Sequence, residues 1–190
     1  MTITGEIVRF WLDEVGQAGW YAAVDAVDDA IRDRFGPLWQ EACEGSHVDW
    51  CETPQGALAY LILTDQFSRN MFRGDARAFA TDAAARAAAR IALGRGLDLA
   101  VEEPARVFFY MPFEHSEALE DQDFAVDLMG RNLPKTGAGY LLHARAHREV
   151  IRRFGRFPFR NDALGRETTP EEAEFLAGGG YAAIVRELGG

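Results

Sequence analysis

Apolar side chains recur three and four positions apart along most of this 190-residue chain, which is the spacing of one face of an α-helix. No stretch alternates apolar and polar residues as a half-buried strand does. The helical spacing predicts the following segments: residues 6–15, 21–35, 53–72, 75–93, 104–112, 117–129, 140–154 and 169–176. We therefore expect an all-α protein.

Local signals mark several ends of these segments. Thr53-Pro54 and Thr169-Pro170 each place a capping hydroxyl before a proline at the first helical position, which favours a helix start. Gly36-Pro37 is expected to interrupt a helix and Gly155 to end one. The short connections predict a single domain over residues 1–190 with about seven to nine helices.

Composition and charge narrow the classes of function. A chain of 190 residues that is 48% hydrophobic can bury about 70% of the surface of its unfolded form, which is enough for one core. Its formal net charge of -10 disfavours nucleic acid or an anionic membrane as a partner, because both demand a basic face. No apolar run has the length of a membrane span, and the start of the chain lacks the features of a signal peptide. With only two cysteines, we expect a cytoplasmic protein.

The first polar motif follows an apolar run, where Leu58–Leu63 passes without a helix breaker into Asp65–Arg73. At helical spacing Asp65, Arg69 and Arg73 fall four apart along one stripe, and Gln66 and Asn70 flank it. Two arginines on one stripe can bind a carboxylate or a phosphate through their guanidinium groups. The same stripe can equally be a structural ion pair at the end of a helix.

A second motif runs from Pro112 to Glu117 and continues to Gln122. A histidine beside several carboxylates, as His115 is, can act as a general base or a metal ligand. Alternatively, His115 and Ser116 cap a helix and Glu117 interacts favourably with its dipole.

Two histidines of a third motif, His143 and His147, lie four apart. That spacing can bind a metal, but Ala144 stands where a zinc protease of the His-Glu-x-x-His type needs its glutamate. The protease interpretation is therefore excluded. Packing or hydrogen bonding of one of the two histidines in the core is favoured over a transition-metal site, and no metal site is assigned.

Arginines are concentrated in a fourth segment, residues 143–166, which holds seven of them against two acidic side chains. Between Arg152 and Asn161 they alternate with aromatic residues. Such a pattern can stack nucleic-acid bases, but in an acidic protein cation–π packing or an anion site is favoured. The chain has no glycine-rich phosphate loop, Cys-x-x-Cys pair or nucleophile elbow.

Taken together, these motifs resemble the bacterial domain-of-unknown-function family 924 over nearly the whole chain. The resemblance rests on Phe10-Trp11, residues 20–35, Asp65–Arg73, Pro112–Glu117 and Phe154–Asn161. It implies a tetratricopeptide-repeat-like superhelix of helix pairs, and it implies no established reaction. The motif positions that carry over are Asp65, Gln66, Arg69, Asn70, Arg73, His115, Ser116, Glu117, Gln122, His147, Arg156, Arg160, Asn161 and Arg166.

This chain departs from the family pattern at two positions. Ala118 stands where the family often has an acidic residue, and Phe159 where it often has histidine. A mechanism that needs either of those side chains is not expected here.

Two hypotheses of function follow. In the first, the motifs form a cleft for a small anionic ligand, with hydrolysis or proton transfer as the chemistry. Asp65, His115 and Glu117 would be catalytic, and the ligand would meet Gln66, Arg69, Asn70, Arg73, Gln122, His147, Arg156, Arg160, Asn161 and Arg166. In the second, the protein is a non-enzymatic module that binds a peptide segment on a concave helical surface, and the motifs brace it. The sequence identifies neither a cofactor nor an oligomeric state.

Overall fold

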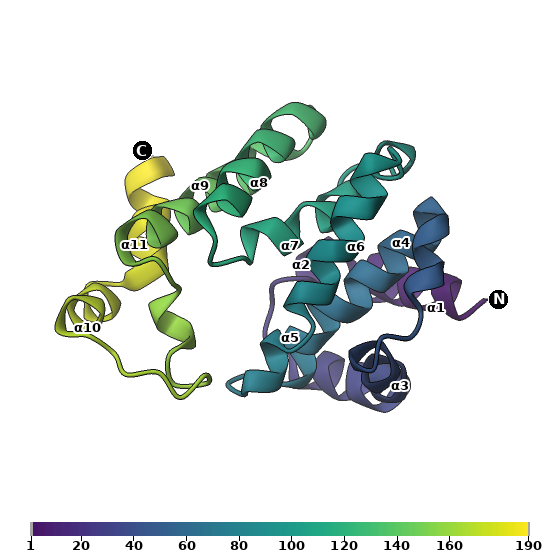
Figure 1. The fold of residues 1–190 in the computed structure, drawn as a ribbon, viewed down its shortest axis with the longest axis horizontal. Coiled ribbons are helices and arrows are strands. Elements are labelled where there is room, and N and C mark those ends of the chain that lie inside the picture. The colour runs from purple at the N-terminus through teal and green to yellow at the C-terminus, as the bar shows by residue number, and fades with distance from the viewer. Residues whose placement is uncertain (1, 190) are drawn as a thin grey trace. The chain divides into compact units, whose positions relative to one another are not determined.

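The computed structural model describes residues 2–189, and every regular element among them is helical, which confirms the all-α prediction (Figure 1). Eleven α-helical segments occur in this part of the chain, and three of them, α2, α5 and α7, have only four residues. Their bounds are α1 Ile3–Arg9, α2 Gly16–Gly19, α3 Asp25–Cys43, α4 Pro54–Leu61, α5 Ser68–Met71, α6 Asp82–Gly94, α7 Met111–Glu114, α8 Leu119–Asn132, α9 Gly137–Phe154, α10 Pro170–Ala177 and α11 Gly180–Gly189.

Short helical turns of other kinds join these segments. Two are π-helical, and they are η1 Phe10–Val15 and η3 Ile62–Phe67. The others are 3₁₀ turns, namely η2 Val48–Glu52, η4 Ala76–Phe79, η5 Asp98–Ala100, η6 Ala105–Phe109 and η7 Pro158–Arg160. No helix among residues 2–189 has the length and apolar character needed to cross a membrane.

The chain forms two compact units, residues 1–112 (unit 1) and 113–190 (unit 2). Each has its own buried side chains. The predictions of a single domain over residues 1–190 and of a tetratricopeptide-like superhelix stay predictions.

Unit 1 is built around the nearly continuous helix of α4, η3 and α5, which packs against α1, α3 and α6. Three phenylalanines from different elements meet beside it, since the ring centroids of Phe35 and Phe67 are 5.0 Å apart and those of Phe10 and Phe35 are 5.3 Å apart. All three are buried. Burial of rings of this size contributes about 1.5–3 kcal/mol each, so this cluster holds the helix that carries the first polar motif.

The expected helix over residues 53–72 forms, but its middle widens into the π-helical η3. A π turn does not pair its carbonyl groups in the α-helical pattern, and side-chain hydroxyls take over part of that role. The backbone carbonyl of Thr64 accepts from Ser68 Oγ at 2.9 Å and from Thr81 Oγ1 at 2.5 Å. The hydrophobic period alone does not distinguish this turn from an α-helix.

Several boundaries differ from the sequence expectation. Gly36-Pro37 does not interrupt α3, and the missing Cβ of Gly36 removes one part of the clash that a residue before proline usually suffers in a helix. Pro112 lies inside α7 and does not end a helix there, since the first turn of a helix needs no N–H at that position. The segment 75–93 begins with a 3₁₀ turn and becomes α-helical only at Asp82.

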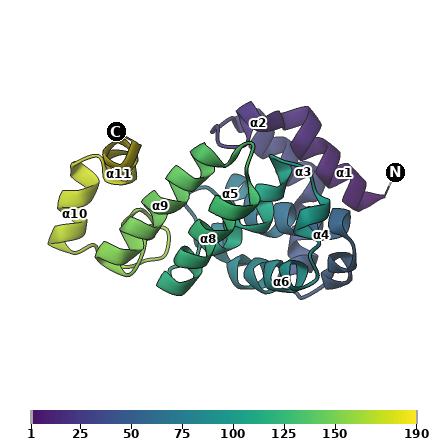
Figure 2. The same cartoon turned by 90° about the horizontal axis from the view of Figure 1, so that it is seen from above.

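Unit 2 is organised around α9, which packs against α8 and α11 (Figure 2). Its core includes Val150 and Ile151 of α9, Phe157 after it and Ile184 of α11. Helix α11 is absent from the sequence prediction because Gly178–Gly180 reads as the end of the last helix. The caps at Thr53 and Thr169 form as predicted, and Gly155 ends α9 at a φ of 67°.

We predict that Gly56→Ala strongly destabilises unit 1. A Cβ at this position would lie 2.1 Å from the carbonyl oxygen of Trp50 and 2.9 Å from the capping Thr53 Oγ1. Overpacking of this kind typically costs about 1–3 kcal/mol, and we expect the upper end because the backbone of η2 must move.

Urea denaturation followed by circular dichroism measures the effect. Gly94→Ala is the control, because nothing lies within 4 Å of its Cβ position, and it should leave stability unchanged or raise it by up to about 1 kcal/mol. Equal stability of the two variants contradicts the prediction.

Candidate functional site

The first polar motif is buried in unit 1. The Asp65 side chain is 1% exposed, and its Oδ2 accepts a hydrogen bond of 2.6 Å from Gln66 Nε2. Arg69 donates to the backbone oxygen of Asp65 at 2.7 Å, and its guanidinium lies 3.3 Å from the Asp65 carboxylate. Arg69 also pairs with Asp82 of α6 at 3.0 Å. Asp65 and Arg69 therefore form an ion pair, with Gln66 as a further donor.

The second half of the motif converges on Asp28 of α3. Asn70 Nδ2 donates to Asp28 Oδ1 at 2.7 Å, and Arg73 donates to both carboxylate oxygens at 2.5 and 3.0 Å. The hydrogen bond to Asp28 raises the pKa of the Arg73 guanidinium above its ordinary value. Asp28 is missing from the sequence prediction because nothing in its helical pattern marks it as buried.

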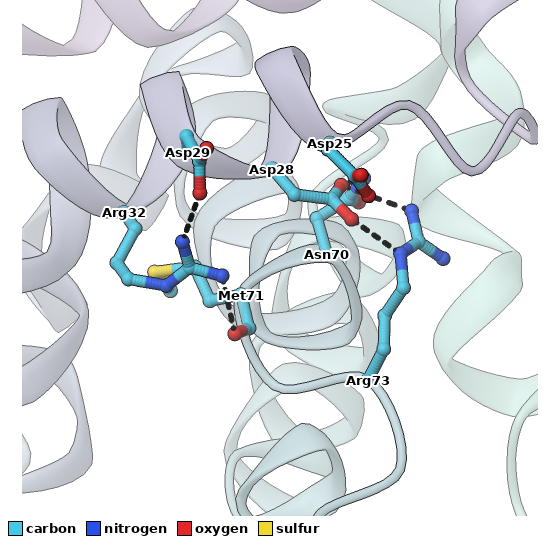
Figure 3. A pocket seen from close by; sticks show the side chains of 7 residues that line it. All are labelled: Asp25, Asp28, Asp29, Arg32, Asn70, Met71 and Arg73. Carbon is cyan, nitrogen blue, oxygen red and sulfur yellow. Dashed lines mark hydrogen bonds and ion pairs between the residues drawn. The ribbon is translucent and has the colours of Figure 1, made fainter.

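A pocket of about 420 Å³ opens beside this carboxylate (Figure 3). Its volume lies in the range of small-molecule sites. It is lined by Asp25, Asp28, Asp29, Arg32, Asn70, Met71 and Arg73. Two residues of the predicted ligand-binding set, Asn70 and Arg73, thus face one pocket, together with charged residues of α3.

In unit 2 the second and fourth motifs meet. Glu117 accepts from the backbone nitrogen of Phe157 at 2.8 Å and from two nitrogens of Arg166 at 2.8 and 3.1 Å. Burial alone would raise the pKa of Glu117, but the hydrogen bonds from Arg166 and Phe157 lower it below the ordinary value. Arg160 donates to the backbone oxygen of His115 at 3.0 Å.

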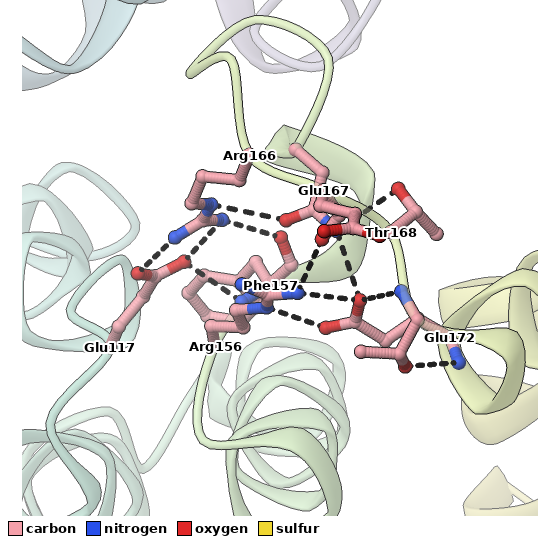
Figure 4. A network of polar contacts seen from close by, with 9 residues as sticks. Glu117, Arg156, Phe157, Arg166, Glu167, Thr168 and Glu172 are labelled. Atoms are coloured by element: carbon pink, nitrogen blue, oxygen red, sulfur yellow. Dashed lines mark hydrogen bonds and ion pairs between the residues drawn. The ribbon is translucent and has the colours of Figure 1, made fainter.

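Arg156 joins the same network through Glu172 of α10 (Figure 4). Asn161 also bonds to the Glu172 carboxylate. Arg156 donates to both Glu172 oxygens at 2.6 and 2.7 Å, and Asn161 Nδ2 donates to one of them at 3.1 Å. These bonds, with that from the backbone of Thr169, lower the pKa of the buried Glu172 to about 2. Arg166 closes the network by donating to Asn161 Oδ1 at 3.0 Å.

These contacts bear on the expected roles of the arginines. Arg73, Arg156 and Arg166 each hold a carboxylate with two hydrogen bonds, and they brace elements that are distant in sequence. That geometry favours the bracing interpretation for Arg156 and Arg166. Contact of these side chains with an anion stays a prediction, as does the catalytic role of Glu117.

The histidine motif has a buried acidic partner. His147 Nδ1 lies 2.7 Å from Glu114 Oε1, and Glu114 is 4% exposed. Burial would raise the pKa of Glu114, but the facing His147 outweighs it and lowers the pKa. His143, one turn earlier on α9, lies 2.6 Å from the hydroxyl of Tyr181 on α11, and desolvation raises the pKa of that hydroxyl.

Gln122 is buried beneath the turn that carries His115. Its Nε2 donates to the backbone oxygens of Glu114 at 2.5 Å and Ser116 at 2.6 Å. Ser116 does not cap a helix at residue 117; α8 begins at Leu119, and the Ser116 hydroxyl accepts from the backbone of Ala118 and donates to Asp121. Gln122 therefore orders this turn, and ligand contact by Gln122 stays a prediction.

Sequence reasoning missed the acidic partners Asp28, Glu114 and Glu172 as well as Tyr181. Glu172 had one usable signal, the spacing Thr169-x-x-Glu172 of a capping box, which the structure contains. Glu114 lies within the second motif, but its sequence position does not identify His147 as its partner. Asp28 and Tyr181 have no local signal, because only the tertiary fold brings them to their partners. Asp65 belongs to unit 1 and His115 and Glu117 to unit 2, so one cleft shared by the three stays a prediction.

Residues 2–189 contain no group of three or more histidine, cysteine, aspartate or glutamate side chains placed to hold a metal ion.

Comparisons with known proteins agree with the resemblance seen in the sequence. A family model described as "Bacterial protein of unknown function (DUF924)" matches residues 7–180. The chain is also similar to the solved structure of a protein of unknown function from Agrobacterium tumefaciens, with 45% sequence identity and a TM-score of 0.86. That alignment covers 92% of this chain and 96% of the other. No curated protein matches the chain.

We predict that Glu172→Gln lowers the free energy of unfolding at pH 7. The difference in this free energy between the variant and the wild type should become smaller in acid. The pKa of Glu172 is about 2 in the folded state against an ordinary value of 4.5, so the stabilisation is complete above about pH 4.5 and is lost as the pH falls toward 2. Urea midpoints at pH 7, 4 and 3 measure it.

Glu171→Gln is the matched control, since Glu171 is the exposed neighbour of Glu172 in the same first turn of α10. It should leave the urea midpoint nearly unchanged at each pH. A Glu172→Gln midpoint equal to that of the wild type at pH 7 contradicts the prediction.

Proposed function

The chain belongs to the DUF924 family of bacterial proteins of unknown function, and from its own geometry we propose that it binds a small polar ligand in the pocket of unit 1. The observation that carries this proposal is the pocket of about 420 Å³ lined by side chains of both charges. It takes in Asn70 and Arg73, which are two of the side chains that the sequence assigns to ligand binding.

The charges of the lining define the ligand. Three carboxylates face two guanidiniums, so the pocket keeps one net negative charge. A purely anionic ligand would be repelled, whereas a ligand with an ammonium group beside its carboxylate or phosphate can satisfy both signs. We propose a small zwitterion, which keeps the anionic group expected from the sequence and adds a cationic one.

Asp29 and Arg32 form the more exposed of the two ion pairs in the lining. Their side chains are 68% and 47% exposed, and Arg32 bonds to Asp29 at 2.5 Å and to the backbone oxygen of Met71 at 3.1 Å. Asp28, by contrast, is buried and already holds two donors. A zwitterionic ligand would therefore break the weak, solvent-exposed Arg32–Asp29 pair and bind each of these side chains with its group of opposite charge. The pair between Asp28 and Arg73 would stay intact.

The test is a thermal-shift titration with α-amino acids, and with the matched carboxylic acids and amines that lack one of the two charges. We expect a zwitterion to raise the melting temperature and the singly charged compounds not to do so. A ligand at 100 times its Kd stabilises the folded state by about 2.7 kcal/mol.

Arg32→Gln and Asp29→Asn should each abolish the shift while leaving the protein folded. Arg77→Gln is the control, because Arg77 forms a similar exposed pair with Asp75 in unit 1 but does not line the pocket. If no zwitterion shifts the melting temperature, or the shift survives both pocket variants, the proposal is wrong.

A further inference from the structure

A second constellation, in unit 2, is independent of the pocket of unit 1. The Glu114 side chain is 5% exposed and faces His147, which is 17% exposed. A carboxylate removed from water must be compensated by donors, and the 2.7 Å contact with His147 Nδ1 provides one. The low pKa of Glu114 keeps it ionised at neutral pH.

The surroundings of His147 fix which ring nitrogen is basic. Nδ1 faces two acceptors, the Glu114 carboxylate and the backbone oxygen of His143 at 3.0 Å. The proton of a neutral His147 ring therefore resides on Nδ1, and Nε2 carries the lone pair. Within residues 2–189, His147 makes no other hydrogen bond, so Nε2 is left without a partner.

The ring itself is held in place by its neighbours. Phe157 meets it edge-on with ring centroids 5.5 Å apart, Tyr181 lies at 4.6 Å and His115 at 6.2 Å. The backbone at Glu114 is held as well, because Gln122 Nε2 donates to its backbone oxygen. The titratable and charged groups around His147 are Glu114 and His115 from the turn before α8, His143 on the same helix, Tyr181 on α11, and Arg160, which lies over the Phe157 ring.

The same residue pair occurs elsewhere in the chain without these features. His47 Nε2 lies 2.7 Å from Glu41, but that glutamate is 53% exposed. Solvent screens the exposed pair, whereas the Glu114 carboxylate is buried and its interaction with His147 is screened much less. His47 is therefore an internal comparison for a histidine–glutamate pair on the surface.

We infer that Glu114 and His147 form a general-base pair in unit 2 that activates water against a small, uncharged carboxylic ester. His147 Nε2 takes a proton from water as the water oxygen bonds to the ester carbonyl carbon. The ester C–O bond then breaks, and the imidazolium returns the proton to the departing alcohol oxygen. Glu114 is the positioning residue, since it holds the tautomer and balances the imidazolium charge. The aromatic rings of Phe157 and Tyr181 beside the imidazole favour a substrate without charge.

The experiment measures hydrolysis of p-nitrophenyl acetate by the purified full-length protein, after subtraction of the buffer rate. We expect His147→Gln to reduce the protein-dependent rate at least about tenfold, since general bases contribute about 10²–10⁴-fold. His47→Gln should retain the wild-type rate, as should the pocket variant Arg32→Gln. This last result separates the inference from the ligand proposal for unit 1. Equal rates for wild type and His147→Gln overturn the inference.

Nitrogen-15 NMR of the wild-type histidines supplies a readout that needs no variant to fold. We expect neutral His147 to carry its proton on Nδ1, and we expect Glu114→Gln, whose amide can accept or donate, to yield a mixture of tautomers. A wild-type His147 that carries its proton on Nε2 overturns the inference, because the lone pair would then face Glu114.

Discussion

Desolvation of carboxylates is the constraint on which the polar architecture of this protein depends. A buried carboxylate is costly unless it collects donors, and each polar motif supplies donors to one of them. In unit 1 the motif 65–73 supplies donors to the buried Asp28 and includes the buried Asp65. In unit 2 Arg156 donates to the buried Glu172, and Arg166 donates to Glu117, which is partly buried. Four of the arginines that look like anion ligands in the sequence therefore pair with carboxylates of the protein itself, namely Arg69, Arg73, Arg156 and Arg166. Their long side chains link elements far apart in the chain, and this explains why charged residues recur inside an apolar framework.

The helical framework could be predicted from the sequence because it depends on local signals. Thr53 and Thr169 form the expected caps, and Gly155 adopts the left-handed conformation that ends α9. Where a boundary depends on context the prediction was wrong, as at Gly36-Pro37, where the small residue lets α3 continue. The extra helix α11 escaped notice because the glycines before it look like an end, whereas its buried Ile184 belongs to a core that only the fold assembles.

Of the candidate site, the sequence predicted the hydrogen-bond donors but not their acceptors. Sequence spacing identified the donors, such as Asn70, Arg73 and His147, because they lie in dense polar motifs. It did not identify Asp28, and it included Glu114 in a motif without assigning it a role, since a carboxylate that becomes buried has the same local pattern as one that stays in water. Glu114 and His147 are 33 positions apart, and no helical period relates them. The partner of a charged side chain is set by the tertiary fold. That partner decides whether the side chain braces two elements, contacts a ligand or acts as a base.

The π-helical turn η3 has a consequence for how tolerant this chain is to change in length. A π turn accommodates one residue more than an α turn, so the residues after it are rotated about 100° from the register that an uninterrupted α-helix would give them. Asn70 and Arg73 meet Asp28 in that rotated register. Loss of a single residue from 62–67 would leave a sound α-helix with its apolar run intact, yet turn both donors away from the carboxylate. The number of residues in this short segment is thus more tightly constrained than their identity. Relatives that share the pocket should also share the additional residue of the π turn.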